Sequence, residues 1–329
     1  MEKFVSLTIS VAMCTYNGAR FLTEQLNSIA RQTRMPDELV VCDDRSTDGT
    51  TEILRDFSRH VRFPIRFKVN EQTLGSTGNF EKAISISQGE IAVLADQDDI
   101  WYPNKLERLE MAFRFSNAVA AFSDADVIDE SSRPLSYRLW ESFSFPASEQ
   151  KRFAAGQALN ILIKHPVVTG AAMAFRREYF PFLAPIPSND VHDQWMSFLL
   201  AACGPYLLIA EPLMQYRRHH SQQIGMGALS LRDRFARARV TGRELYRSEI
   251  ARFQQLYARL ELHRSAMPGA EHAMAEITKK ISHLQHRLRL REEKLARVPQ
   301  IFREVCKQSY WRYGAGWESV AKDLFMNKQ

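Results

Sequence analysis

Short runs of apolar residues alternate with amphipathic segments through the first third of the chain. The apolar runs predict buried strands at 7–13, 38–42, 65–70 and 91–95. The segments between them predict helices at about 20–31, from a Ser/Thr/Asp-rich cap region at 43–50 to about 58, and within 75–87. Strands that alternate with helices of this length are typical of an α/β fold with a doubly wound, mostly parallel sheet.

The pattern is less regular in the middle of the chain. It predicts strands at 118–128, 167–176 and 213–216, a loop from 129 to about 150, and a helix that starts at His192. Gly170 lies inside the second of these strands, where a glycine can mark a close approach of the backbone to a ligand. The long apolar stretch 195–214 is interrupted by Gly204-Pro205 and Glu211-Pro212. It therefore predicts a buried helix, a turn and a strand rather than a membrane span.

After Gly225-Met226-Gly227 the pattern changes to two long amphipathic segments. Their apolar residues recur at spacings of three and four: Tyr246, Ile250, Phe253, Tyr257 and Leu260, then Met274, Ile277, Ile281, Leu284 and Leu288. This spacing predicts two helices, joined at Pro268-Gly269 into an αα-hairpin. We therefore divide the chain into a first domain at 1–225 and an α-helical C-terminal extension at 226–329.

The two predicted domains differ in charge. Residues 226–329 contain 21 Lys and Arg against 11 Asp and Glu, a balance of +10, whereas residues 1–225 have a balance of −4. A basic extension can meet nucleic acid or an anionic membrane surface, and its apolar stripes can also mediate oligomerisation. The cluster Tyr310-Trp311-Arg312-Tyr313 and Trp317 suits a membrane interface. Packing of this cluster against the first domain is the interpretation that we favour.

The overall composition is ordinary for a globular protein, with 329 residues, 45% hydrophobic and 25% charged. The four scattered cysteines (Cys14, Cys42, Cys203 and Cys306) form no CxxC pair, which predicts reduced thiols rather than a disulfide frame or a zinc site. Residues 1–8 are too short and too polar for a signal peptide. We expect a cytoplasmic location, with peripheral contact to the inner membrane left open.

The chemistry begins with the acidic run Asp96-Gln97-Asp98-Asp99, which directly follows the predicted strand at 91–95. Open α/β sheets bind ligands at the C-terminal ends of their strands, and carboxylates there suit Mg²⁺ or Mn²⁺ bridging a diphosphate. The alternative is an acidic turn before a helix, because Pro103 resembles a first helical residue. The chain has no GxGxxG and no Walker A sequence, so any phosphates must be held in another way.

Four fragments together resemble the family 2 glycosyltransferases, which have the GT-A fold. They are residues 11–17 (VAMCTYN), 39–50 (LVVCDDRSTDGT), 96–101 (DQDDIW) and 192–195 (HDQW). The resemblance covers about residues 8–225. Residues 78–80 (GNF) and 216–220 (YRRHH) are similar to the bacterial branch often assigned to rhamnosyl transfer. That branch mostly builds lipopolysaccharide O-antigen and other surface glycans.

The resemblance implies a nucleotide site after the first two strands. Thr15, Tyr16 and Asn17 would contact the base and ribose, and Tyr16 could offer a stacking face. Asp43 would accept a hydrogen bond from the imide N–H of uracil or thymine, with Asp44 beside it. The alternatives are a tyrosine at the rim of a turn, and two carboxylates that cap the next helix.

The resemblance also implies a metal site and a catalytic base. Asp96 would contact the ribose or the surroundings of the metal, and Asp98 would bind Mn²⁺ or Mg²⁺, which offsets charge on the leaving diphosphate. His219 could add a ligand or a phosphate contact. Asp193 would remove the proton of the acceptor hydroxyl, unless it only caps a helix. Many relatives carry an acidic residue where His192 stands, which leaves a role for His192 in tuning the base open.

The sequence therefore predicts an inverting, metal-dependent glycosyltransferase. The expected donor is dTDP-rhamnose or a UDP-sugar, and the expected acceptor is a hydroxyl of a growing surface glycan such as lipopolysaccharide O-antigen. The basic extension would hold the enzyme near a lipid-linked acceptor or form a homodimer. The alternative is a non-catalytic subunit that binds sugar nucleotides or glycans. A nucleic-acid binder ranks last, because the basic residues of the extension form no nucleic-acid motif.

Overall fold

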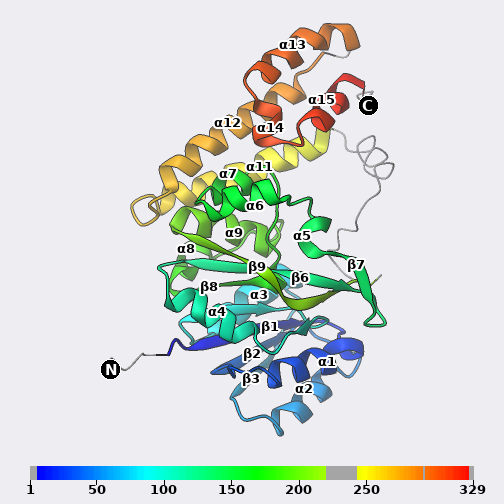
Figure 1. Cartoon of the computed structure of the whole chain (residues 1–329), viewed down its shortest axis with the longest axis vertical. Helices are drawn as coiled ribbons and strands as arrows, with labels where there is room; N and C mark the ends of the chain where they lie inside the picture. The colour runs from blue at the N-terminus through cyan, green and yellow to red at the C-terminus, as the bar shows by residue number, and fades with distance from the viewer. Residues whose placement is uncertain (1–5, 220–242, 292, 326–329) are drawn as a thin grey trace.

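The computed structural model describes residues 6–219, 243–291 and 293–325. A nine-stranded sheet runs through the molecule in the order β3-β2-β1-β4-β8-β6-β9-β5, with β7 paired to β6. Helices cover the sheet, and a helical region extends from one end of it (Figure 1). The boundary that we set at 225/226 lies outside the described residues.

The first part of the fold is a parallel α/β layer, as predicted. It consists of β1 (Ile9–Thr15), α1 (Ala19–Ala30), β2 (Glu38–Asp43), α2 (Thr50–Ser58), β3 (Ile65–Val69), α3 (Gly75–Ile86) and β4 (Ile91–Ala95). The three pairings among these strands are all parallel. Alternate residues of β1 face opposite cores: Ala12 packs with Phe80 of α3, and Val11 packs with Leu22 of α1. Helices thus cover both faces, as a doubly wound sheet requires.

The second part of the sheet mixes directions. It contains β5 (Ile100–Trp101), β6 (Ala120–Ile128), β7 (Pro134–Arg138), β8 (Met173–Arg176) and β9 (Tyr206–Arg217). β6 and β9 are parallel, whereas β8 is antiparallel to both β4 and β6. β5 is antiparallel to β9, and β7 is antiparallel to β6. The parallel prediction therefore holds for the first four strands, and the whole sheet is mixed.

Several segments of the second part differ from the predictions. The strand expected at 167–176 begins only at Met173, because residues Gly170–Ala172 form the 3₁₀ turn η1. The strand expected at 213–216 begins at Tyr206, and the predicted loop before residue 150 contains β7 and α5. The remaining elements here are α4 (Lys105–Arg114), α5 (Leu139–Ser142), α6 (Ala147–Ala154), α7 (Ala158–Leu162), η2 (Arg177–Tyr179), α8 (Phe180–Leu183) and α9 (His192–Cys203).

The predicted hairpin is present as α11 (Arg243–Leu262) and α12 (Ala270–Leu288). Its turn rests on α9, where Gly269 N–H donates to the Ala202 carbonyl at 2.8 Å. A Cβ at Gly269 would lie 2.9 Å from that oxygen, so the close contact requires glycine. Phe253, Leu256 and Ile277 belong to the same apolar cluster as residues of the first part of the chain. Most of the apolar stripe residues of the hairpin are thus buried between its two helices and against the sheet domain, with Tyr257 exposed.

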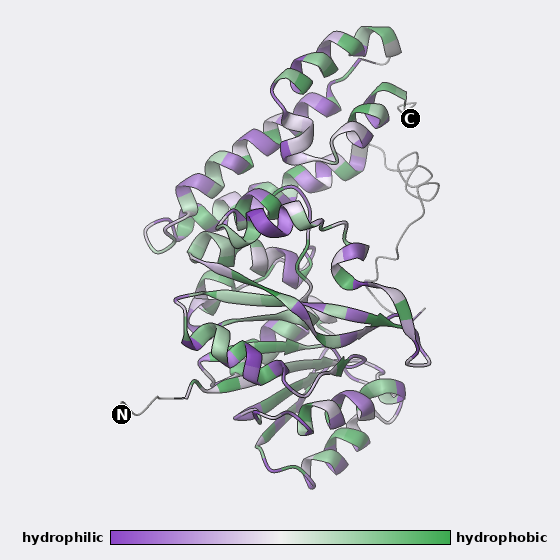
Figure 2. Ribbon diagram, viewed as in Figure 1, coloured by the Kyte–Doolittle hydropathy of each residue, from purple (hydrophilic) through white to green (hydrophobic). Residues whose placement is uncertain are grey.

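Three further helices, not predicted, follow the hairpin: α13 (Lys294–Cys306), α14 (Ser309–Tyr313) and α15 (Trp317–Phe325). Tyr310 and Tyr313 are buried, whereas Trp311 and Trp317 are exposed. Tyr310 lies in a cluster made by the last helices, whereas Tyr313 belongs to the apolar cluster that also contains residues of the sheet domain. Figure 2 shows strongly hydrophobic strands inside the sheet and mixed helices around them. None of the described helices is long and apolar enough to cross a membrane.

Candidate active site

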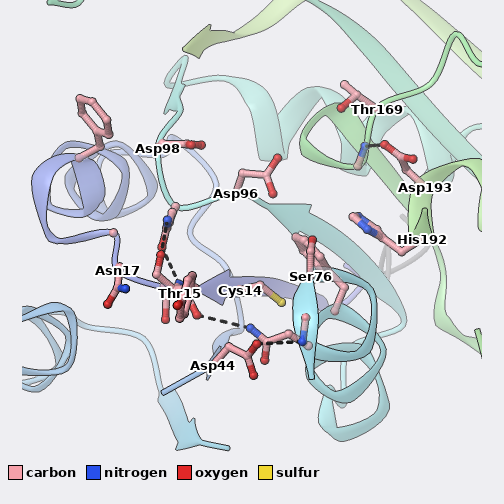
Figure 3. Close-up of a pocket in the computed structure, with 18 of the residues that line it drawn as sticks. Cys14, Thr15, Asn17, Asp44, Ser76, Asp96, Asp98, Thr169, His192 and Asp193 are labelled. Carbon is pink, nitrogen blue, oxygen red and sulfur yellow. Dashed lines mark hydrogen bonds between the residues drawn. The ribbon is translucent and has the colours of Figure 1, made fainter. Parts of the chain in front are cut away.

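A cavity of about 580 Å³ opens at the C-terminal ends of β1 and β4. Eight of the nine predicted site residues line it: Thr15, Tyr16, Asn17, Asp44, Asp96, Asp98, Asp193 and His219. The strand ends of β1 and β4, the start of α3, the start of α9 and the end of β9 all contribute to its wall. Figure 3 shows Asp98 and Asn17 on one side, His192 and Asp193 on the other, and Asp96 between them.

The loop after β1 is fixed by a residue that the sequence analysis did not single out. The Gln97 side chain pairs with the backbone of Tyr16, accepting from its N–H at 2.9 Å and donating to its carbonyl at 3.0 Å. Asn17 has a φ of 47°, a left-handed conformation that asparagine tolerates, and its side chain accepts from Thr47 N–H. Gln97 thus ties the acidic run to the predicted nucleotide loop. The sequence feature that could have identified Gln97 is its position as an uncharged amide between the carboxylates Asp96 and Asp98.

The two carboxylates after β2 have different environments. Asp43 is fully buried and does not line the cavity; it accepts hydrogen bonds from Thr15 Oγ1 at 2.7 Å and from Ser46 N–H at 2.8 Å. This geometry gives Asp43 the role of fixing Thr15, and its direct contact with a base stays a prediction. Asp44 lines the cavity and accepts from the N–H groups of Leu74 and Gly75. Asp44 therefore caps the start of α3, rather than α2, the helix that follows it in the sequence.

The acidic run crowds negative charge at the end of β4. Burial, together with the carboxylates of Asp98 and Asp193, raises the pKa of Asp96 to about 8. Lys105 lies fully buried beneath the run, and burial lowers its pKa to about 7 even though Asp99 and Asp96 oppose the shift. Its ammonium donates to the Ala171 carbonyl at 2.8 Å. Crowded carboxylates of this kind favour the binding of a cation.

Asp98 and His219 offer adjacent metal-binding atoms. Asp98 Oδ2 lies 2.8 Å from His219 Nε2, although the two residues are 121 positions apart in the sequence. Among the described residues there is no group of three or more His, Cys, Asp or Glu placed to hold a metal. Two protein ligands still fit Mg²⁺ or Mn²⁺, because such ions in phosphate sites commonly take one or two carboxylates, with waters and phosphate oxygens completing the shell. The pair therefore fits a cation that is shared with a diphosphate.

Arg217 holds the acidic run in place from behind. Its side chain is fully buried, its Nε donates to the Asp98 carbonyl at 2.7 Å, and its backbone N–H donates to Asp99 Oδ1 at 3.0 Å. Its guanidinium also pairs with Glu24 at 2.6 Å and lies over the Phe21 ring. Asp99 is buried and does not line the cavity, so it acts as an anchor for β9. Neither Arg217 nor Glu24 was singled out from the sequence.

Asp193 lies in the first turn of α9, opposite the acidic run. Its Oδ2 accepts from Gly170 N–H at 3.0 Å, and its Oδ1 has no hydrogen-bond partner among the described residues. The N-cap of α9 is Val191, so the capping alternative for Asp193 is not what the structure shows. One carboxylate oxygen is thus held in position by the backbone, while the other is buried at the cavity wall without a described partner.

His192 is buried beside Asp193 and stacks on Phe80 with a centroid distance of 4.2 Å. Neither of its ring nitrogens has a hydrogen-bond partner within the described ranges, and burial lowers its pKa. A Cβ at Gly170 would lie 2.5 Å from His192 Nε2, so glycine is required where η1 passes the ring.

Comparisons with known proteins agree with this geometry. The model of the family "Glycosyl transferase family 2" matches residues 10–182. An uncharacterized glycosyltransferase, alr2836 of Nostoc sp., is 27% identical over 65% of this chain, and the match spans 65% of that relative. The dTDP-rhamnosyl transferase RfbG of Shigella flexneri is 26% identical over 75% of this chain and 84% of its own length.

The fold is likewise similar to a solved structure. Residues 1–349 of TarS from S. aureus, crystallised with UDP-GlcNAc, superpose with a TM-score of 0.59 at 16% identity, covering 90% of this chain and 80% of that one. At this level of identity the likeness concerns the fold alone, and it supports the GT-A type. Because the family model matches more than half of the sequence, the chain belongs to glycosyl transferase family 2.

Proposed function

We propose that this protein is an inverting, metal-dependent glycosyltransferase that moves a sugar from a nucleoside diphosphate donor to a hydroxyl acceptor. The observation that carries the proposal is the arrangement of one cavity. It has the Asp98–His219 pair on one side and, on the other, the single carboxylate Asp193 with a free oxygen. An inverting glycosyl transfer needs a site for the leaving group on one side of the sugar and a general base on the other, and the cavity offers both.

The nucleotide would lie along the loop after β1. Tyr16 is 46% exposed at the cavity wall, and its ring can stack on a base because its backbone is held by Gln97. Asn17 and Thr15 line the same wall, where they can reach the ribose. The favoured donor is dTDP-rhamnose, which is supported by the rhamnosyl transferase of Shigella flexneri among the relatives. A UDP-sugar is the second choice.

Asp98 and His219 would hold Mn²⁺ or Mg²⁺, and Asp96 would lie beside the ion or the ribose. The ion supplies positive charge that stabilises the diphosphate as it leaves. Arg217 and Gln97 keep the ligand-bearing segment in register with the nucleotide loop. The acidic run therefore binds the leaving group without contributing a nucleophile.

Asp193 would take the proton from the acceptor hydroxyl as that oxygen attacks the anomeric carbon. The Gly170 N–H holds one oxygen, so the other is positioned to act as base. The bond from the anomeric carbon to the diphosphate breaks as the new glycosidic bond forms. A single displacement of this kind inverts the anomeric configuration, and the new linkage can be read by NMR of the product.

The acceptor would be a growing surface glycan such as lipopolysaccharide O-antigen, presented on a lipid carrier. This acceptor class rests on the resemblance of residues 78–80 and 216–220 to the bacterial branch that builds surface glycans. We also keep the division at 225/226 as a proposal, with the helical extension serving location rather than chemistry. The described part of the extension contributes no residue to the cavity wall.

The first experiment is a thermal-shift panel of dTDP, UDP, GDP and CMP, each with Mn²⁺, with Mg²⁺ or with chelator. A ligand at 100 times its Kd stabilises the folded state by about 2.7 kcal/mol. We expect a metal-dependent rise in Tm with dTDP or UDP, which Asp98→Asn abolishes. A shift without turnover of any donor would favour a non-catalytic binding subunit, and no shift with any nucleotide would contradict the proposal.

A further inference from the structure

Helix α13 has its polarity inverted relative to an ordinary surface helix. Its buried side carries charge beside one apolar contact: Ile301 packs in the cluster of the last helices, whereas Arg297 donates to the Asp323 carbonyl at 3.1 Å and Glu304 accepts from His283 Nδ1 at 2.8 Å. Its outer side carries apolar residues, with Leu295 88% exposed and Phe302 65% exposed. A helix normally buries its apolar side, so the outer side of α13 is built to meet something other than water.

The exposed apolar residues form one stripe. Leu295, Val298 and Phe302 are three and four positions apart, which places them on the same face of the helix. Pro299, also exposed, lies within this stripe. We call these four residues the α13 face. Single exposed apolar residues are ordinary on protein surfaces, whereas a contiguous apolar stripe marks an interaction site.

The neighbouring helix α15 repeats the feature. Trp317 is 67% exposed and Phe325 is 72% exposed, and α15 is joined to α13 by the Arg297–Asp323 contact. Both helices lie at the end of the molecule away from β2 and β3, and Figure 2 shows strongly hydrophobic stretches on each. The segment that forms these helices is also mildly basic, since residues 293–325 contain six Lys and Arg against four Asp and Glu, a balance of +2.

The charges beside the α13 face identify its occupant. The exposed cations Arg303 and Lys307 follow the stripe on the same helix, and the exposed Arg291 precedes it; Glu293 is an exposed acidic neighbour. A second copy of the chain would bring an equally basic rim against this one. An anionic lipid surface has the complementary charge, and exposed Leu, Phe and Trp beside Arg and Lys are typical of helices that lie in a membrane interface.

We propose that the α13 face inserts into an anionic lipid surface and thereby holds the enzyme on the membrane. This inference goes beyond the proposed function, because it does not depend on which sugar or acceptor the cavity takes. It narrows the expectation from sequence, which covered the whole extension at 226–329, to one face of one helix. The stripes of α11 and α12 are mostly buried between the two helices and against the sheet domain, whereas those of α13 and α15 are exposed.

The test is co-sedimentation of the full chain with vesicles of phosphatidylcholine containing phosphatidylglycerol. We expect binding that weakens with added salt and is at least about tenfold weaker to pure phosphatidylcholine. The double variant Leu295→Ser/Phe302→Ser is expected to lower affinity by about tenfold or more, because two large side chains no longer enter the lipid. The matched control is Leu262→Ser at the end of α11, where the leucine is 73% exposed outside the α13 face.

Two results would overturn the inference. One is equal vesicle binding by the double variant and the wild type, or no binding by either. The other is a wild-type dimer in light scattering that the double variant converts to a monomer, which would assign the α13 face to a second copy. The nucleotide thermal shift of the double variant should match that of the wild type, because α13 contributes nothing to the cavity wall. The vesicle experiment can therefore contradict lipid binding without affecting the proposed function. Equally, the nucleotide experiment can contradict the proposed function without affecting lipid binding.

Discussion

The cavity and the C-terminal helices depart from ordinary packing in opposite ways. In the cavity, polar atoms inside the protein have no partner among the described residues, including both ring nitrogens of His192 and Oδ1 of Asp193. In the helices, the buried charges Arg287 and Lys280 are paired with Asp323 and Glu249, and Nε2 of His283 is a single buried polar atom without a described partner, while large apolar residues face outward. The missing partner of the first region is polar and that of the second is apolar. Each region therefore indicates the chemistry of what it binds.

The comparison is tested most strongly at Asp193. Asp193→Asn keeps an oxygen that can accept from Gly170 N–H but removes the base, so the fold and nucleotide binding should be unchanged. We expect kcat to fall by about 10²–10⁴-fold, the range contributed by a general base. Transfer from radiolabelled donor to acceptor measures this loss, and a nucleotide thermal shift equal to that of the wild type serves as the control. Activity within a few-fold of the wild type would remove Asp193 from the mechanism.

The second test concerns stability in the helices. Asp323→Asn removes the charge that Arg287 contacts at 2.7 Å and 3.1 Å, and leaves a guanidinium buried without its counter-ion. Breaking one partner of a buried ion pair costs about 3–5 kcal/mol. Urea denaturation should report a loss of this size, and a change below 1 kcal/mol, by the same principle, would show that the pair is not buried as described.

Asp96→Asn makes the same chemical change in the cavity. We expect it to stabilise the protein, whereas Asp323→Asn should destabilise it. The pKa of Asp96 is raised to about 8, so the folded protein prefers the neutral form, and stability is lost as the pH rises from about 4 to 8. An uncharged Asn at pH 7 avoids this loss and should stabilise the metal-free protein by up to about 4 kcal/mol. The same denaturation experiment, run with chelator, measures it. A destabilised Asp96→Asn protein would contradict the view that the cavity is strained by unpaired charge.

Much of this arrangement follows from sequence, and the exceptions have identifiable causes. The first four strands follow from apolar runs, because burial on both faces of a sheet leaves no polar alternation. Asp43 and Asp44 could not be separated in the same way: successive residues at a strand end point to opposite sides, and only the structure shows that Asp44 lines the cavity. Gln97 was missed because it acts through the backbone of Tyr16.

In the C-terminal extension, the apolar pattern predicted the hairpin but not helix α13. The hairpin was predicted because its apolar stripes are mostly covered, so periodicity and burial agree. Helix α13 was missed because its apolar stripe faces outward while Arg297 and Glu304 lie inside. A pattern indicates which residues share a face, but the partner of that face is set by contacts such as Arg297 with Asp323, far along the chain.

The third test is the acid sensitivity of the helices. His283 is buried among Arg287, Lys280 and Glu304, and burial is the main cause that lowers its pKa to about 4. In the unfolded chain His283 is protonated below about pH 6.5, whereas in the folded protein it stays neutral until about pH 4. The free energy of unfolding is therefore highest above pH 6.5 and decreases as the pH falls toward 4. We expect His283→Asn to remove about 2 kcal/mol of the loss between pH 7 and pH 5. Denaturation at the two pH values, with wild type in parallel, checks this. An unchanged pH dependence would mean that His283 titrates normally.

The smallest effect on stability is expected at His192. A substitution there should change activity without changing stability, which distinguishes the cavity from the C-terminal helices. His192→Phe removes two ring nitrogens that have no described partner and keeps an aromatic ring to stack on Phe80, so unfolding free energy should change by less than ~1 kcal/mol. If those nitrogens await a hydroxyl of donor or acceptor, activity should fall by roughly 10–100-fold, the cost of a lost hydrogen bond in the transition state. A rise in KM without a change in kcat would place His192 in ground-state binding, whereas a fall in kcat would place it beside the reacting atoms. Full activity in a stable His192→Phe protein would make the ring a packing element and reduce the polar contrast of the cavity to Asp193.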